Sequence, residues 1–289
     1  METITYTNRL GESVTLGGPP FYLQKINGLG DVSAETQTQR APYQDGSTYI
    51  DSTLDERFID LEFLIVNELG EGYGKISEKR TKIARVLNPK LGLGILRYEN
   101  ESVVREIYCV AESVPIYPDD IRAKTLQKGL VTLRAPSPYW LTEETADQLT
   151  VWEGGLKFPL KLPSKFARMS LNKAKIILND GNAETPFQAI FNGPATAPIK
   201  LINKTTGKYI EVKQSLIEGE KMIINTAFGQ KRVTKVLIDG TQINAFHFIT
   251  IGSSFFNLIQ GNNLLDYSTG ADYERAAVQI IYRNRYLAV

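Results

Sequence analysis

The stretch GLVTLRAPSPYW, residues 129–140, marks the point at which a first structural core is completed. Its first half alternates apolar and polar side chains, which is typical of a half-buried β-strand. The two prolines then end the strand, because proline cannot donate to a sheet ladder and holds the preceding residue in an extended conformation. We expect Tyr139 and Trp140 to fold back over this core as an apolar lid, each with its polar tip on water or a backbone carbonyl.

Alternation of this kind dominates the chain. In RFIDLEFLI, residues 57–65, the apolar side chains fall on one face and the acidic ones on the other. VVREIYCV at 103–110 and LVTLR at 130–134 are typical of half-buried strands as well. After residue 165 the pattern returns in KAKIILN, FQAIFNG, PIKLIN, KYIEVK, KMIIN, AFHFITI and AAVQIIYR. Turn signals such as Asp-Gly and Asn-Gly separate these segments, so the sequence predicts a mainly β fold of sandwich or barrel type.

One segment has the period of a helix instead. GKISEKRTKIARVLNP, residues 74–89, places Ile76, Ile83, Val86 and Leu87 along one side, and its Asn-Pro pair supplies a stop. The basic side chains lie largely on the other faces, where they meet either solvent or an acidic partner. We favour a helix that packs on the core and turns a solvated basic face outward.

The length of the chain, 289 residues, is sufficient for two domains. The polar, acidic stretch LTEETADQLT follows the lid and is the best candidate for a linker. We therefore expect a first domain over residues 1–140, a linker or transition over 141–160 and a second domain over 161–289. Residues 1–150 carry 16 basic and 22 acidic side chains, and the remainder carries 17 and 10. The two halves either face different partners or present two independently solvated surfaces.

Composition excludes several classes of protein. Apolar residues make up 42% of the chain and charged residues 22%, which is typical of a globular protein and not of a disordered one. No apolar run approaches the roughly 18 residues that span a bilayer, and the N-terminal stretch lacks the pattern of a secretion signal, so we expect no membrane association. The single cysteine, Cys109, excludes an intramolecular disulfide and removes any need for an oxidising compartment.

The sequence contains no recognisable catalytic or metal-binding motif. The only histidine, His247, lies in AFHFIT, which we expect to be an alternating strand, and a lone histidine there is typically structural or exposed. A dyad with Cys109 would need a reactive thiol, whereas the context IYCV favours a small buried residue. No His/Cys spacing fits a metal, and no P-loop, G-x-S-x-G or H-E-x-x-H occurs. We predict no catalytic, cofactor-binding or metal-binding residues, no cofactor and no enzyme activity.

Acidic residues could still form a catalytic site, because a glycosidase needs only two carboxylates at a suitable separation. Five of them cluster in sequence: Asp51, Asp55, Glu56, Asp60 and Glu62. Such residues are common on exposed strand faces, which is the simpler interpretation. NDGNAE at 179–184 lacks the spacing of a calcium loop, and GLGDVSAE at 28–35 lacks a dinucleotide-binding pattern, so both are interpreted as turns. No basic run is interleaved with aromatics, so we expect no specific recognition of nucleic acid.

The order of several motifs resembles that of the distal tail proteins of long, non-contractile-tailed phages. The stretch from 28 to 65 is similar to the first-domain signature of that family, with a glycine turn, a Gln-Asp-Gly loop and a strand led by arginine. Residues 91–115 are similar to its next hairpin, and 130–140 to the segment that closes its first domain. Residues 179–212 resemble the start of its second domain, and LIQGNNLL at 258–265 resembles its closing turn, with Gln260 where proline is usual.

The resemblance implies both a fold and a function. The fold would be an N-terminal, tail-tube-like β-sandwich with one α-helix, followed by a C-terminal galectin-like β-sandwich. Six copies would form a ring, or hub, that joins the tail tube to the tail-tip or baseplate proteins around a DNA channel. The partners would be the tail tube protein, the tail-associated lysin or fibre protein and the tape measure protein. The protein would be part of the virion, at the tail tip, after assembly in the host cytoplasm.

Two other functions are left open by the residues. A carbohydrate- or receptor-binding module of the tail tip is the alternative, and exposed Tyr or Trp beside Asn and Asp in the second domain would favour it. Trp152, at the start of that half, is the one tryptophan found there. A glycan hydrolase is the third candidate.

Overall fold

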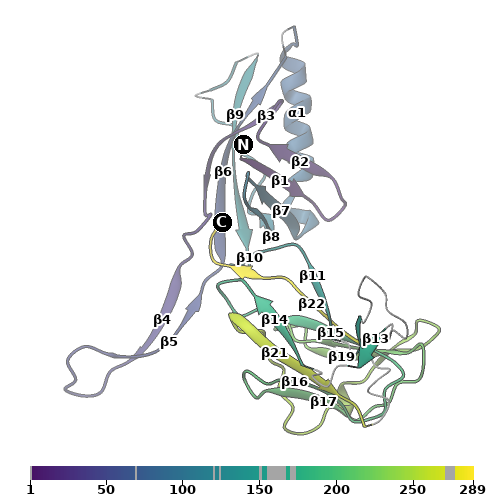
Figure 1. Ribbon diagram of the computed structural model, residues 1–289. Helices are drawn as coiled ribbons and strands as arrows, with labels where there is room; N and C mark the ends of the chain where they lie inside the picture. Colours follow the sequence, from purple (N-terminus) through teal and green to yellow (C-terminus); the bar gives the residue numbers. More distant parts are fainter. Residues whose placement is uncertain are drawn as a thin grey trace, which may run out of the picture. The chain divides into compact units, whose positions relative to one another are not determined.

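The computed structural model describes residues 2–68, 70–119, 121–123, 125–149, 174–270 and 277–289, and the backbone of 152–154 and 167–169. The chain divides into two compact units (Figure 1). The first unit is Met1–Glu143 together with Tyr286–Val289, and the second is Glu144–Arg285. In the described part of the chain, no helix is long and apolar enough to cross a membrane.

The first unit is built mostly from strands that form one continuous hydrogen-bonded path. Its strands are β1 (Thr3–Thr7), β2 (Ser13–Leu16), β3 (Phe21–Asn27), β4 (Ala34–Gln39), β5 (Thr48–Leu54), β6 (Arg57–Val66), β7 (Gly94–Glu99), β8 (Val104–Ala111), β9 (Leu126–Ala135) and β10 (Trp140–Leu141). The path runs β2-β1-β7-β8-β9-β6-β3, with β10 paired to β8 and to β23 (Arg285–Tyr286). Strands β4 and β5 form a separate two-stranded sheet.

This path bends into two layers at the junction of β8 and β9. These two strands share pairs at Val110 and Ala111, whereas β6 and β9 pair over ten residues. Alternation places Ile59, Leu61, Phe63 and Ile65 of β6 on the inner face, where they are buried with Ile4 of β1, Leu96 of β7 and Ile107 of β8. The predicted strand over 57–65 is therefore confirmed, and its apolar face is the centre of the first core.

The predicted helix is confirmed as α1 (Tyr73–Val86), which contacts β6 and β2. Ile76, Ile83 and Val86 are its buried residues, in keeping with the apolar side predicted from the sequence. Basic residues on its outer faces form ion pairs: Lys75 with Glu78, Lys79 with Glu71 and Arg85 with Glu12. A short 3-10 helix, η1 (Pro89–Leu91), follows.

The second unit is a β-sandwich of two sheets. The six-stranded sheet runs β11 (Thr145–Leu149), β22 (Ala277–Tyr282), β15 (Phe187–Asn192), β18 (Lys221–Asn225), β19 (Arg232–Val236) and β20 (Gln242–Asn244). The four-stranded sheet runs β14 (Lys175–Asn179), β21 (Gly261–Ser268), β16 (Ile199–Asn203) and β17 (Tyr209–Val212). Strands β12 (Trp152–Gly154) and β13 (Ala167–Met169) pair with each other.

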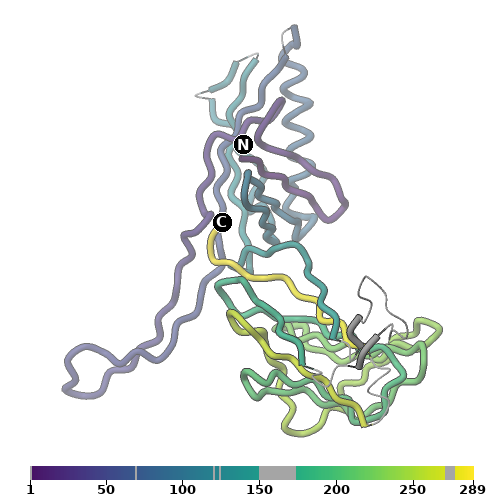
Figure 2. Tube along the Cα trace, in the orientation of Figure 1, coloured from purple at the N-terminus to yellow at the C-terminus, as the bar shows by residue number. Residues whose placement is uncertain are grey.

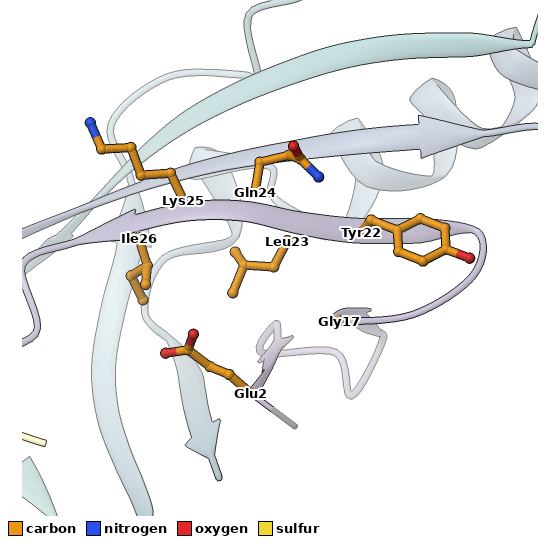
Figure 3. A pocket seen from close by; sticks show the side chains of 7 residues that line it. All are labelled: Glu2, Gly17, Tyr22, Leu23, Gln24, Lys25 and Ile26. Carbon is orange, nitrogen blue, oxygen red and sulfur yellow. The ribbon is translucent and has the colours of Figure 1, made fainter.

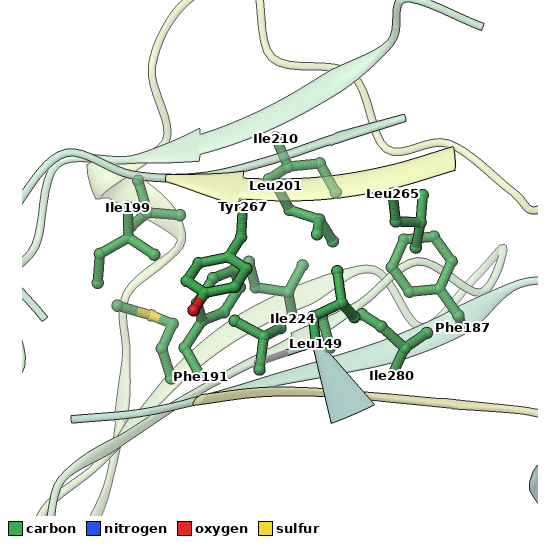
Figure 4. Packing of buried hydrophobic residues seen from close by; sticks show 14 of the residues in the cluster. Leu149, Phe187, Phe191, Ile199, Leu201, Ile210, Ile224, Leu265, Tyr267 and Ile280 are labelled. Atoms are coloured by element: carbon green, nitrogen blue, oxygen red, sulfur yellow. The ribbon is translucent and has the colours of Figure 1, made fainter. Parts of the chain in front are cut away.

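The core of the second unit lies between its two sheets. Figure 4 shows Leu201 and Tyr267 of the four-stranded sheet facing Phe191, Ile224 and Ile280 of the six-stranded sheet. All five are at most 1% exposed. Inward residues alternate with outward ones along each strand, as the period-two pattern after residue 165 predicted. The mainly β fold with one helix is therefore confirmed.

Three features differ from the sequence prediction. AFHFITI does not form a strand, because residues 246–248 close a 3-10 turn, η2, in which the Ile249 N–H donates to the Phe246 carbonyl. Residues 145–149, placed in the expected linker, form β11 and pair along β22. The last four residues belong to the first unit instead of the second. Much of the expected linker, at 150–151 and 155–160, lies outside the described residues.

Candidate assembly surfaces

The buried side chain of Arg57 fastens together three distant segments of the first unit. Arg57 is 0% exposed although it carries a charge. Its Nε donates to the Pro138 carbonyl at 2.9 Å and its Nη1 to the Gly28 carbonyl at 2.7 Å, while Nη2 donates to the Leu287 carbonyl. The lid segment, the turn at Gly28 and the C-terminal residues thus converge on one guanidinium.

Local geometry makes this cluster tight. A Cβ on Gly28 would lie 2.1 Å from the Phe58 carbonyl oxygen, and the φ of Gly28 is +91°, so only glycine fits there. Burial lowers the pKa of the Arg57 guanidinium, and the negative charge of Asp31 opposes that shift. Three carbonyl acceptors compensate for the lost hydration of the charge.

The lid is formed by Trp140 alone. Its ring is fully buried, packs edge-on to Tyr98 with 6.4 Å between ring centroids, and lies 5.9 Å from the Arg57 guanidinium carbon. Its Nε1 has no hydrogen-bond partner among the described residues, so the expectation of a satisfied polar tip was wrong for this residue. Tyr139 remains half-buried. Strand β9 ends at Ala135, directly before the first proline, as predicted.

A two-stranded arm, residues 33–55, projects away from the first unit's sheets (Figure 1 and Figure 2). Every residue of its strands β4 and β5 is exposed. The strands have no continuous apolar face to bury, because AETQTQ is polar on both sides and TYIDSTL carries Tyr49, Ile50 and Leu54 among polar residues. This arm was not predicted from the sequence, although the lack of an apolar face in AETQTQ indicates a strand without a core.

The tip of the arm, residues 40–47, is held by its own hydrogen bonds. Arg40 Nε donates to the Gln44 carbonyl at 3.0 Å, and the Gln44 side chain accepts from the Ala41 N–H and donates to Thr48 Oγ1. Tyr43 is fully exposed and has a φ of +63°, which is unusual for a residue with a side chain. The tip therefore presents an aromatic ring from a fixed loop.

A groove of about 530 Å³ lies at the base of the same arm. Its lining residues are Ser33, Leu54, Asp55, Glu56, Phe58 and Pro136. Leu54 and Phe58 are 37% and 45% exposed, so apolar surface is open to solvent there. Arg134 donates to Glu56 at 2.6 Å, and this hydrogen bond lowers the pKa of the Glu56 carboxyl. The groove therefore places exposed apolar side chains beside the carboxylates of Asp55 and Glu56.

A second opening, of about 300 Å³, lies along β3 between the two layers of the first unit. Figure 3 shows Leu23 and Ile26 of β3 and the carboxylate of Glu2 pointing into it, while Lys25 and Gln24 point away. Strand β3 is at the end of the sheet path, with a bulge between Leu23 and Lys25. An edge strand above an apolar floor can accept an added strand.

The two residues considered for nucleophilic chemistry lie in different units. His247 is exposed in η2 and its ring lies 4.0 Å from that of Phe248. Cys109 is fully buried in β8, and burial raises the pKa of its thiol to about 12. A thiol with that pKa is protonated at neutral pH and is no nucleophile.

The five clustered carboxylates are spread over the arm and the face of β6. Asp60 accepts from Thr132 Oγ1 at 2.7 Å, and Glu62 pairs with Lys128 at 3.1 Å. Asp51 accepts from the Ser52 N–H on the arm. Each of these three oxygens has a cross-strand or local partner, as on an ordinary strand face. Within the residues that the structure describes, no group of three or more His, Cys, Asp and Glu side chains could hold a metal.

Among the described Phe, Tyr and Trp side chains of the second unit, the exposed rings are phenylalanines. Phe228 is 94% exposed, and Phe246 stacks on Phe255 with 5.8 Å between ring centroids. Tyr209 lies under the Lys200 ammonium at 4.0 Å and is half-buried. The side chain of Trp152 lies outside the described residues. This surface lacks the Tyr–Asn or Trp–Asp pairs that would favour sugar binding, as far as the described side chains extend.

Comparison with known proteins gives the same division of the chain. Residues 11–135 match the model of the phage tail protein RIFT-related domain, and residues 180–286 match the siphovirus-type tail component, C-terminal domain. No curated protein matches the chain.

Solved structures of phage tail proteins have the same fold. The crystal structure of the Dit (gp 19.1) protein of phage SPP1, a paradigm of the hub adsorption apparatus in phages that infect Gram-positive hosts, superimposes with a TM-score of 0.68 at 14% identity, over 99% of each chain. A chain of the phage P2 baseplate, activated with Ca, gives 0.52 at 13% over 97% of each chain. The baseplate activated with Sr gives 0.52 at 13%, over 97% of this chain and 98% of that one.

The two matched regions together span most of the sequence, in the order that the motifs predicted, and the mainly β fold agrees with them. The chain belongs to the siphophage distal tail protein family and is a structural component of the phage tail, of the baseplate-hub type.

Proposed function

We propose that six copies of this chain form a ring that joins the end of the tail tube to the tail-tip proteins and leaves a central channel for DNA. The family, and the hub and baseplate structures to which the fold is similar, support this proposal. The observation that carries it is the arm of residues 33–55, whose two strands are exposed throughout.

An arm of this kind needs a partner. A two-stranded hairpin with no core is marginally stable in water, and its free edges invite pairing with another chain. The arm is acidic, with Glu35, Asp45, Asp51 and Asp55 against Arg40, yet it carries exposed Tyr43, Tyr49 and Ile50. Apolar side chains in this setting are typical of an interface. A contact between two different surfaces of the same chain closes into a ring when the rotation permits.

In this proposal the first unit makes the ring, and the second unit, a galectin-like sandwich, projects outward as an independent domain. An excess of acidic residues in 1–150 suits a channel through which DNA must pass without binding, because affinity for phosphate comes mainly from Lys and Arg. The role is structural and not enzymatic. Its partners are the tail tube protein, the tail-associated lysin or fibre protein and the tape measure protein, in a virion assembled in the host cytoplasm.

Light scattering coupled to size exclusion, with negative-stain electron microscopy of the same fractions, tests the ring. We expect a mass of six copies and images with a central hole. A variant in which a short Gly-Ser turn replaces residues 34–54 should stay folded, because the arm adds nothing to either core, but should no longer assemble. A wild-type protein that is monomeric at every accessible concentration would contradict the proposal.

A further inference from the structure

The tip of the arm and the groove at its base carry complementary side chains. The tip offers the fully exposed ring of Tyr43 and the guanidinium of Arg40, for which the described part of the chain supplies no ion pair. The groove offers the exposed apolar side chains of Leu54 and Phe58 and the carboxylate of Asp55, for which the described residues supply no cation either. A ring flanked by a cation thus matches apolar side chains flanked by an anion.

The loop at the tip is also held in one conformation before any partner binds. Four hydrogen bonds among Arg40, Ala41, Gln44 and Thr48 fix the loop, and Tyr43 holds a left-handed backbone conformation within it. Little conformational freedom is therefore lost when the ring docks, and an aromatic side chain buries a large area with few rotatable bonds.

No chain can fill its own groove. Strand β4 alone, six residues long, separates the tip from the base by about 20 Å at roughly 3.3 Å per residue. The hairpin ladder, from Ala34–Leu54 to Gln39–Thr48, keeps the arm extended. The complementary surfaces must therefore meet between copies, as a head-to-tail contact.

We propose that Tyr43 at the arm tip of one copy inserts into the groove of Leu54, Phe58 and Pro136 at the arm base of the next copy, with Arg40 paired to that copy's Asp55. The occupant of the groove is thus a second copy of this chain. This inference rests on the proposed ring and names the contact that closes it.

Disulfide trapping tests the contact directly. Cys109 is buried and unreactive, so the pair Ser33→Cys with Pro42→Cys introduces the accessible thiols and keeps the Tyr43 ring that makes the contact. Mild oxidation should give a ladder of linked chains that ends at the hexamer on a non-reducing gel. The matched control pairs Ser33→Cys with Gln37→Cys, in the middle of β4. Position 37 lies well short of the tip, so it should not reach the groove of the next copy, and a disulfide needs Cβ atoms about 4 Å apart. It should give no such ladder.

Single substitutions at the proposed contact provide an independent measurement. Tyr43→Ala and Arg40→Glu should each raise the protein concentration at which half of the chains are assembled at least about tenfold. Tyr43→Phe should change that concentration little. Combining Arg40→Glu with Asp55→Arg should restore assembly. All these positions are exposed, so thermal melts should be unchanged.

The outcomes separate this inference from the proposed function. A hexamer that yields no ladder from the tip–base pair, or that assembles normally with Tyr43→Ala, would refute the tip–groove contact and leave the ring standing. A wild-type monomer would refute both.

Discussion

Arg57 donates a hydrogen bond from Nε to the carbonyl oxygen of Pro138 at 2.9 Å, across 81 positions of the sequence. Pro138 belongs to the segment that ends β9 and brings Trp140 onto the core, and Arg57 is the first residue of β6, the partner strand of β9. The same guanidinium also reaches Gly28 and Leu287. One buried cation therefore determines how three irregular segments of this distal tail protein close its first unit.

Substitution Arg57→Met should strongly destabilise the first unit. It leaves the carbonyls of Gly28, Pro138 and Leu287 without their donor, and each unsatisfied buried acceptor costs about 1–3 kcal/mol. We expect a loss of about 3 kcal/mol or more in the free energy of unfolding, measured by urea titration. Arg134→Met is the control, because its ion pair with Glu56 is exposed and screened by solvent, so its loss should change stability little. Equal losses in the two variants would show that Arg57 does not fasten the unit.

Deletion of the last three residues should loosen the first unit and spare the second. It removes the Leu287 carbonyl that accepts from Arg57 and the Val289 N–H that donates to Leu29 at 3.2 Å. We expect faster amide exchange in residues 1–143, read by mass spectrometry, and unchanged exchange in 144–285. A chain ending at Leu287 keeps an acceptor for Arg57 and should lie close to wild type. Faster exchange confined to the second unit would contradict the division of the chain that we describe.

Cys109 should make the protein sensitive to alkali. Its pKa is raised by burial from the usual 9.0 to about 12, so between these values the unfolded chain loses a proton that the folded chain keeps. Stability therefore falls as pH rises from about 9, by about 1.4 kcal/mol per pH unit for this group. Tyr6, whose pKa is raised to about 12 mainly by burial, adds to the effect above pH 10.

In the variant Cys109→Ala, the free energy of unfolding should depend less on pH, because the thiol no longer contributes to that dependence. Urea midpoints at pH 8 and pH 10 would show a smaller difference for the variant than for the wild type. A thiol reagent at pH 8 should modify the wild type only after unfolding. Rapid modification of the native protein would mean that Cys109 is accessible.

Two glycine substitutions should change stability in opposite directions. A Cβ on Gly129, in β9, would lie 2.4 Å from the ring of Phe63, so Gly129→Ala should cost about 1–3 kcal/mol through overpacking. A Cβ on Gly74, in α1, meets nothing within 4 Å, so Gly74→Ala should stabilise by up to about 1 kcal/mol. Thermal melts of the two variants measure both effects, and a stabilising Gly129→Ala would show that Phe63 can move aside.

Much of the fold follows from local chemistry. Alternation along RFIDLEFLI is sufficient to predict β6 and its buried face, because side chains of a strand point to opposite sides in turn. The spacing of Ile76, Ile83 and Val86 is likewise sufficient to predict α1. Prediction failed at AFHFITI, where alternation over a few residues also fits a turn, and hydrogen bonds to residues outside the segment decide between the two.

The sequence by itself determined the two β-rich units, the helix, the end of β9 at the prolines and the lack of catalytic motifs, since these depend on neighbouring residues. It also placed Arg57 in register with Ile59 and Leu61, on the inner face of β6. Only the tertiary structure decided what that arginine does there, because its three acceptors come from positions 28, 138 and 287. Only the tertiary structure showed that residues 33–55 form an exposed arm. Strands without an apolar face give no periodic signal in the sequence, and neither core includes residues of β4 or β5.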